Sequence, residues 1–167
     1  NLKASFSLSV GRHKDQVTCS NSEELAFGFP ILGSKQYVWD HYKPTPVMST
    51  YTLAIMVSKF GYTEAISKRG IQFRSWFFKE NFNWTKKVTE NGAIIMDYLQ
   101  EHVFKDLPYP LQKMDQIVVP TKGRSAMENW GMITYGYEYL SPLITSEMAG
   151  DVGGYVSNLA IAHELSH

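Results

Sequence analysis

The sequence has very little cysteine: Cys19 is the only one among 167 residues. A single thiol cannot form an internal disulfide, and it cannot build a zinc site from cysteine ligands. An excess of charge is also missing, because 16 Lys and Arg residues balance 16 Asp and Glu residues. Such a balance gives no electrostatic case for binding nucleic acid or an anionic membrane surface. We therefore expect no nucleic-acid partner.

Long hydrophobic runs are absent as well. The longest aliphatic run, Leu53–Val57, is far shorter than the roughly 18 residues that a membrane span needs. The chain does not begin with Met, and its first residues already alternate like a strand, so we expect its true start to lie upstream. Membrane attachment of a longer parent protein stays open, but this segment would not supply it.

What is present is a globular composition, 44% hydrophobic and 14% aromatic, in the length of one ordinary domain. Alternating and β-branched residues predict strands over 3–10, 36–42, 47–60, 71–78, 115–119 and 132–139. We expect 47–60 to be a central strand and the polar stretch 11–24 to be a turn and connection. One long helix is expected from Asn83 to Val103, and another ends the chain. Mixed strands and two long helices indicate an α+β fold.

The last five residues, His163 to His167, read H-E-x-x-H. Positions i and i+4 lie on one face of a helix, so His163 and His167 can direct two imidazoles at one point. Two neutral imidazoles suit a zinc ion. Glu164 lies about 100° around the helix, where a carboxylate can reach an activated water without ligating the metal. The pattern predicts a zinc hydrolase site with Glu164 as the catalytic base.

The residues before this motif favour a buried helix. Val156, Leu159 and Ala160 share the face of the two histidines, and the other faces are also apolar. A helix that is apolar on most sides is expected to be buried. The alternative is that two histidines fall four apart on a core helix by chance and bind no metal.

A second constellation, Ser125-Ala126-Met127-Glu128-Asn129-Trp130-Gly131, precedes the last predicted strand. A Glu and an Asn between Met and Trp are poor patterning for a core, which favours a functional site. This stretch, followed 35 residues after Glu128 by the H-E-x-x-H motif, resembles the zinc aminopeptidases of the aminopeptidase N type, which are gluzincin metallopeptidases. The ranges 46–51, 107–111 and 115–120 also match that family in order.

The resemblance covers essentially the whole chain and implies an internal fragment of such an enzyme. Residues 1–18 would be the end of a β-rich N-terminal domain. Residues 19–167 would be the first part of a thermolysin-like catalytic domain, with a mixed sheet and helices, truncated after the H-E-x-x-H motif.

Carried over residue by residue, the resemblance implies that His163 and His167 bind one Zn²⁺ and that Glu164 acts first as general base and then as proton donor. Glu128 would bind the free α-ammonium of a peptide substrate, because a carboxylate anchored near zinc favours a positively charged chain end. The implied substrate-binding residues are Ser125, Ala126, Met127, Glu128 and Asn129. The family's third zinc ligand, a Glu, and its oxyanion-stabilising Tyr would lie beyond His167, so we expect this piece alone neither to hold zinc tightly nor to hydrolyse peptides.

Ser125 departs from the family, which has Gly at this position. Serine adds a side chain where substrate backbone would pass closely, so Ser125→Gly is expected to raise turnover. The departure leaves open an alternative function, a catalytically weakened aminopeptidase-like ectodomain that binds peptides or serves as a receptor.

The compartment is predicted only from weak signals. A glycosylation sequon, Asn83-Trp84-Thr85, and a charged fraction of 19% favour an extracellular or cell-surface, membrane-associated glycoprotein. A cytoplasmic location is the alternative.

Overall fold

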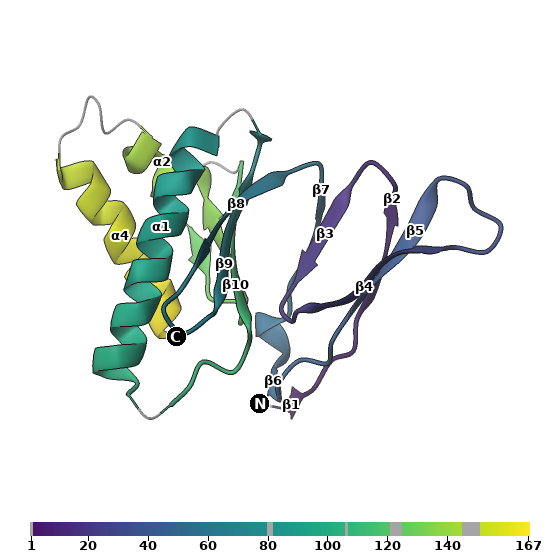
Figure 1. Ribbon diagram of the computed structural model, residues 1–167, viewed down its shortest axis with the longest axis horizontal. Coiled ribbons are helices and arrows are strands. Elements are labelled where there is room, and N and C mark those ends of the chain that lie inside the picture. The colour runs from purple at the N-terminus through teal and green to yellow at the C-terminus, as the bar shows by residue number, and fades with distance from the viewer. Residues whose placement is uncertain (1, 80–81, 106, 121–124, 145–150) are drawn as a thin grey trace.

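The computed structural model describes residues 2–79, 82–105, 107–120, 125–144 and 151–167. Figure 1 shows two adjoining parts: a sheet covered by helices, and an elongated β-rich part built from the first third of the chain. Mixed sheets with helices make the fold α+β, as the sequence predicts.

The larger sheet has five strands in the order β11-β12-β10-β9-β8. Its three inner strands are mutually parallel, and the edge strands β8 and β11 run antiparallel to their neighbours. The strands are β8 (Gly61–Ile66), β9 (Gln72–Phe77), β10 (Lys113–Val119), β11 (Ala126–Met127) and β12 (Met132–Gly136). The short strand β11, which contains part of the second motif, therefore lies at one edge.

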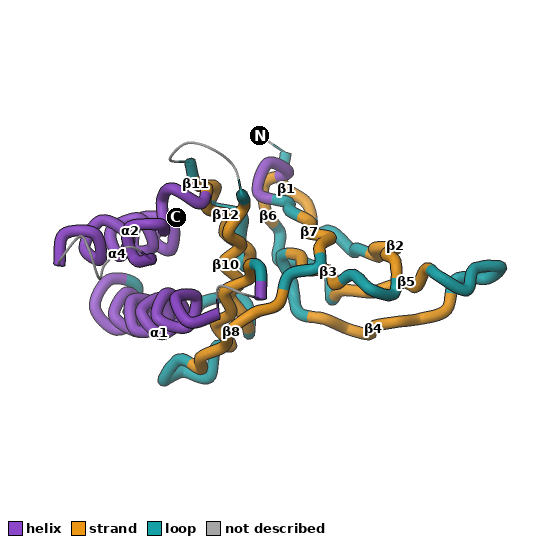
Figure 2. The backbone as a smooth tube through the Cα atoms, turned by 90° about the horizontal axis from the view of Figure 1, so that it is seen from above, coloured by secondary structure: helices purple, strands orange, loops and turns teal. Residues whose placement is uncertain are grey.

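Helices cover one face of this sheet, as the view from above shows (Figure 2). They are α1 (Phe82–Tyr98), which continues as a single π-helical stretch (Leu99–Val103), α2 (Tyr137–Ile144) and α4 (Asp151–Ser166). The core between them contains Phe73, Met96, Val118, Ile133 and Ile161, all buried. Gly92 lets α1 approach the sheet closely, since a Cβ there would lie 2.4 Å from the ring of Phe73. Ile161 places the helix that ends in H-E-x-x-H in the same core, against the sheet.

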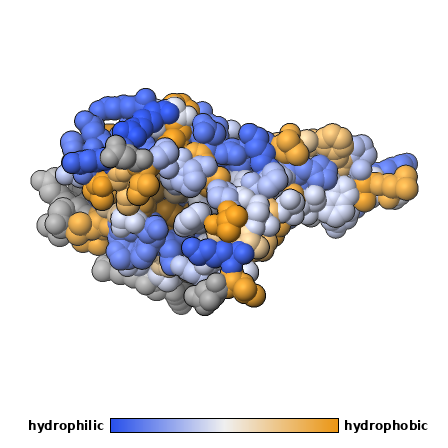
Figure 3. Space-filling model, turned by 90° about the horizontal axis from the view of Figure 1, so that it is seen from below, coloured by the Kyte–Doolittle hydropathy of each residue, from blue (hydrophilic) through white to orange (hydrophobic). Residues whose placement is uncertain are grey.

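The β-rich part consists of three small antiparallel sheets. Strands β2 (Ser9–His13), β5 (Tyr37–Tyr42) and β4 (Glu24–Pro30) form the first. Strand β3 (Val17–Ser20) pairs with β7 (Ile55–Ser58), and β1 (Lys3–Ala4) pairs with β6 (Met48–Ser49), which precedes a 3₁₀ turn (Thr50–Thr52). Hydrophobic surface is exposed at the outer end of this part, where Leu32 is fully accessible (Figure 3).

Three expectations about the strands are wrong. The range 11–24 is not a connection, because β3 and parts of β2 and β4 lie in it. The range 47–60 is not one central strand: the turn at Thr50–Thr52 divides it, and both pieces pair outside the larger sheet. The strand expected over 132–139 ends at Gly136, where α2 begins. The helix expected from Asn83 begins at Phe82, so its existence is confirmed.

In the described part of the chain, no helix is both long and apolar enough to cross a membrane.

A buried charge cluster joins the two parts on the sheet face opposite the helices. Asp115 is fully buried and accepts hydrogen bonds from Arg74 Nε (2.6 Å), Arg74 Nη2 (2.8 Å) and Trp76 Nε1 (2.6 Å). Lys113 Nζ lies 2.7 Å from Asp115 Oδ2, the oxygen that also accepts from Arg74 Nη2, and Arg74 pairs with Glu24 of β4 at 2.8 Å. Burial by itself would raise the pKa of Asp115, but Lys113 and Arg74 hold it well below its usual range.

This cluster predicts an acid-sensitive fold. Because the pKa of Asp115 is lower in the folded state, its contribution to stability is complete above about pH 4, the unfolded pKa, and is lost as pH falls further. We expect Asp115→Asn to lower the thermal midpoint strongly at pH 7, since breaking a buried pair costs about 3–5 kcal/mol. The difference from wild type should shrink towards pH 3. The exposed Glu101→Gln is the control, and an Asp115→Asn protein as stable as wild type at pH 7 would refute this account.

Candidate zinc hydrolase site

The two histidines of the motif converge at the end of α4. Their Nε2 atoms lie 3.3 Å apart, and their ring centroids are 4.8 Å apart at an interplanar angle of 88°. Two zinc–nitrogen bonds of about 2.0–2.1 Å at a tetrahedral angle place the two nitrogens about 3.3 Å apart. Both imidazoles are exposed at the surface of the described residues. The residues present therefore fit two ligand positions of one zinc ion.

No group of three or more His, Cys, Asp or Glu side chains gathers around one point within the ranges that the structure describes. His163 and His167 are accordingly a candidate pair of ligands rather than a complete three-ligand site within these residues.

Glu164 lies between the two histidines in sequence but on a more buried side of the helix. Only 9% of its surface is exposed to solvent. Burial raises the pKa of Glu164, the two histidines oppose that rise, and the negative charge of Glu128 adds to it. A carboxylate with a raised pKa is a better proton acceptor than an ordinary Glu, so Glu164 suits the role of a base.

The orientation of α4 corrects one expectation. Its buried face runs through Ser157, Ala160 and Ile161, whereas Leu159 is 50% exposed and His163 is exposed. Apolar residues were expected to bury this helix on most sides, including the side of the histidines. The helix packs against α1 and α2, and its Ile161 enters the core beside the sheet, while the two imidazoles remain accessible.

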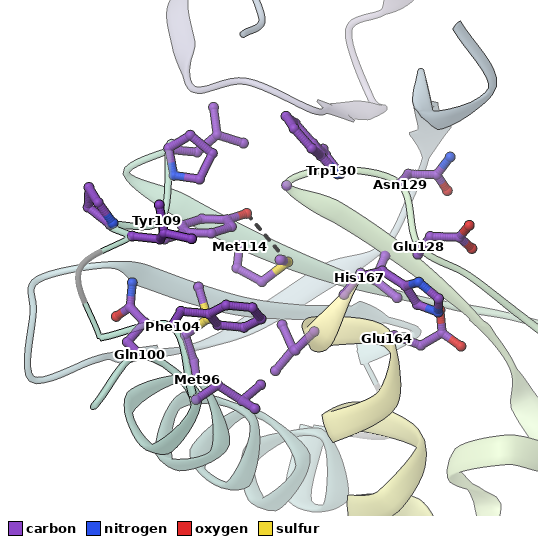
Figure 4. Close-up of a pocket in the computed structure, with 18 residues that line it drawn as sticks. Met96, Gln100, Phe104, Tyr109, Met114, Glu128, Asn129, Trp130, Glu164 and His167 are labelled. Carbon is purple, nitrogen blue, oxygen red and sulfur yellow. Dashed lines mark hydrogen bonds between the residues drawn. The ribbon is translucent and has the colours of Figure 1, made fainter. Parts of the chain in front are cut away.

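The second motif lies beside the first. Ala126 pairs with Tyr135 and Met127 pairs with Thr134, so β11 forms the sheet edge next to the end of α4. In Figure 4, Glu128 lies next to His167 and Glu164. The structure therefore brings the carboxylate of the second motif to the end of α4 that carries the first motif.

The other residues of the second motif have separate environments. Ser125 is exposed, and its carbonyl accepts a hydrogen bond from Gly136 N at 2.7 Å. Asn129 is 6% exposed, and its carbonyl accepts one from Met132 N at 3.0 Å. These bonds shape the turn after β11 rather than leaving the motif as a free loop.

Glu128, Glu164 and His167 line a common pocket of about 280 Å³. The remainder of its wall is mostly apolar and comes from α1, the segment after it, β10 and β12, as Figure 4 shows. Prominent members of this wall are Met96, Leu99, Phe104, Tyr109, Met114 and Ile133. Two carboxylates and an imidazole at the border of an apolar cavity are the usual composition of a ligand site.

Two further residues, Asn21 and Lys113, hold the turn that follows Glu128, and sequence patterns did not single them out. Each donates a side-chain hydrogen bond to a carbonyl of that turn, to Trp130 and to Gly131 respectively. For Lys113 a signal existed, because a Lys beside a strand predicted to be buried needs a partner. Asn21 stands in a polar stretch, and only the fold shows that it is completely buried.

Comparison with known proteins agrees with this geometry. Residues 88–167 match the Peptidase family M1 domain. Over this segment the chain is therefore similar to M1 peptidases. It is 33% identical over 165 residues to aminopeptidase N of Haemonchus contortus and 33% identical over 173 residues to human aminopeptidase N. It is 27% identical over 166 residues to human endoplasmic reticulum aminopeptidase 1.

These three alignments each cover 99% of this chain, so the similarity to these aminopeptidases extends over nearly the whole sequence. The chain spans only 16–17% of the length of these relatives.

Proposed function

We propose that the whole protein is a zinc-dependent aminopeptidase that removes N-terminal residues from peptides. The observation that carries this proposal is the 3.3 Å approach of the two Nε2 atoms, with Glu164 between them in sequence and Glu128 at the same pocket. His163 and His167 would hold the zinc, which when bound supplies a Lewis acid and makes water a nucleophile near neutral pH.

Glu164 would move the protons of the reaction. Its carboxylate takes a proton from the attacking water, for which its raised pKa suits it, and then passes that proton to the leaving amine. The partly buried position of Glu164 limits competing hydration, so the proton stays within the site.

Glu128 would make the enzyme an exopeptidase. A carboxylate beside the metal ligands accepts the α-ammonium of a substrate, and a chain that continues past this point has no charge to offer. Strand β11 lies at the sheet edge, where Ala126 and Met127 can pair with an extended substrate backbone. Ser125 and Asn129 flank this segment and complete the proposed substrate-binding residues.

The test compares two peptides in the full-length, zinc-loaded protein, one with a free N-terminus and one acetylated there. We expect release of the first residue from the free peptide only, and its abolition by a chelator and restoration by zinc. Glu128→Gln should weaken the preference for the free amine by about 10- to 100-fold, as expected for losing one charged partner. Equal cleavage of both peptides would refute the exopeptidase assignment.

The domain organisation is proposed on the same basis. Residues 19–167 would be the first part of a thermolysin-like catalytic domain, and 1–18 the end of a preceding β-rich domain. A Glu C-terminal to residue 167 would be the third zinc ligand, so the 167-residue piece should bind zinc weakly and lack activity. Zinc binding with micromolar or better affinity by the isolated piece would contradict this.

One observation favours an alternative, a weakened aminopeptidase-like protein that binds peptides or acts as a receptor. Ser125 is exposed immediately before the proposed substrate-pairing strand, where the family has Gly. If the protein is an enzyme and this side chain obstructs the substrate, Ser125→Gly should raise kcat. Measured turnover of the full-length protein separates the two functions, because a binder retains peptide affinity without turnover.

We further propose an extracellular or cell-surface, membrane-associated location for the whole protein, with cytoplasmic as the alternative. The support is the sequon at Asn83–Thr85, in the first turn of α1. A mass decrease on enzymatic deglycosylation of the natural protein would support it, and an unchanged mass would count against it.

A further inference from the structure

The turn that carries Glu128 is bound from behind by the side chain of Asn21. Asn21 follows β3 and is completely buried. Its Nδ2 donates to the carbonyls of Trp130 (2.7 Å) and Thr52 (2.8 Å), and its Oδ1 accepts from Ala54 N (2.9 Å). One amide thus joins the turn to the segment that links β6 to β7. Asn21 itself does not line the pocket, whereas Trp130, which accepts its hydrogen bond, does.

Lys113 binds the next carbonyl of the same turn. Its Nζ donates to Gly131 O at 2.9 Å and also to the carbonyl of Ser20, and it pairs with Asp115. The backbone N of Asp115 donates to Gly131 O as well, at 3.0 Å. Lys113 is 1% exposed, so this ammonium is held by protein partners rather than by bulk water.

The two side chains therefore fix two consecutive carbonyls, two and three residues after Glu128. The turn is short: β11 ends at Met127 and β12 begins at Met132. Asn21 and Ser20 belong to the β-rich part. Glu128, in contrast, lies beside Glu164 and His167 at the C-terminal end of α4. Residues of the β-rich part therefore contact the backbone of the turn 128–131, whose first residue lines the pocket.

We propose that Asn21 and Lys113 are positioning residues for Glu128, which set the affinity of the site for the α-ammonium of the substrate. The inference rests on the proposed function. A charged contact depends steeply on geometry, because a displacement of about 1 Å lengthens the hydrogen bond beyond its useful range. Neither side chain needs to touch substrate to have this effect.

The test uses the full-length, zinc-loaded protein and two inhibitors, an amino-acid hydroxamate and the matched acyl hydroxamate without the α-amino group. Both chelate zinc through the same atoms, and only the first offers an ammonium to Glu128. In wild type the ratio of the two inhibition constants should favour the amino compound. Asn21→Asp removes the donor to Trp130 at constant size, and we expect it to reduce this ratio about tenfold, the effect of weakening one charged hydrogen bond.

Thr18→Val is the matched control. Thr18 lies on β3, the strand that Asn21 follows, and is also buried, and its hydroxyl bonds to Asp40 and Tyr42 rather than to the turn. This variant should lower the thermal midpoint and leave the inhibitor ratio unchanged. Lys113→Met, which leaves Arg74 on Asp115, is measured in the same way and decides the question should Asn21→Asp not fold.

A folded Asn21→Asp or Lys113→Met variant with the wild-type ratio would overturn the positioning role. A wild-type protein that hydrolyses peptides but binds both hydroxamates equally would refute the role of Glu128, and the positioning role with it. A wild-type protein without hydrolysis would refute the proposed function itself, so the two failures are distinguishable.

Discussion

Replacing Glu164 by Gln in the full-length, zinc-loaded protein is expected to reduce kcat about 100- to 10,000-fold, the contribution usual for a general base. The amide keeps the size of the side chain but cannot accept a proton from water. Because Glu164 is not expected to ligate the metal, zinc content should stay at the wild-type level. Initial rates on an aminoacyl amide, with zinc measured on the same samples, give the result.

The matched control is Glu101→Gln, an exposed carboxylate on the π-helical stretch that does not line the pocket. Its kcat should equal that of wild type. A Glu164→Gln enzyme that retains more than about a tenth of wild-type kcat would show that another group takes the proton.

Gly131→Ala is expected to lower the free energy of unfolding substantially and to disturb the site. Gly131 has φ of +72°, and a Cβ there would lie 2.1 Å from the carbonyl oxygen of Asn21. The left-handed conformation costs an L-residue about 1–2 kcal/mol, and overpacking adds about 1–3 kcal/mol. We therefore expect a loss of about 3 kcal/mol and displacement of the turn that carries Glu128, measured as thermal midpoint and as kcat/KM.

Gly70→Ala separates the two causes. Gly70 has φ of +81° and nothing within 4 Å of the position a Cβ would take. It should therefore show the conformational cost alone, about 1 kcal/mol, and normal kinetics. Equal effects of the two substitutions would mean that the contact with Asn21 is unimportant.

Much of the candidate site could be predicted from the sequence because its information is local. The spacing of His163 and His167 fixes a shared helical face whatever the rest of the chain does. The sequence alone also indicated that Ser125–Gly131 is unusual. That Glu128 reaches the pocket beside Glu164 required the fold, because β11 and α4 are joined only through the sheet and the helices between them.

The strand expected over 36–42 is confirmed as β5 (Tyr37–Tyr42). Most of the remaining β-rich part could not be predicted, since its polar residues are satisfied by distant partners. Thr18, Ser20 and Asn21 read as a polar connection, yet all three are buried. The bond from Asn21 to Trp130 spans 109 residues, and the one from Lys113 to Ser20 spans 93. No local pattern contains such information.

The range 47–60 shows that apolar residues, too, can mislead a prediction from local sequence. Its β-branched residues favour a strand throughout, but Asn21 binds the backbone of Thr52 and Ala54, and Thr52 Oγ1 donates to Ser49 O at 2.7 Å. These bonds stabilise the 3₁₀ turn that divides the range. Local propensity is overridden by a buried side chain from elsewhere in the chain.

The measurement that tests the central claim most directly is zinc K-edge X-ray absorption of the full-length protein and of His167→Ala. The account predicts a first shell of nitrogen and oxygen only, with imidazole nitrogens at about 2.0–2.1 Å, and a loss of one imidazole or of the zinc in the variant. A sulfur scatterer at about 2.3 Å, or an unchanged imidazole contribution in the variant, would place the metal elsewhere and contradict the account.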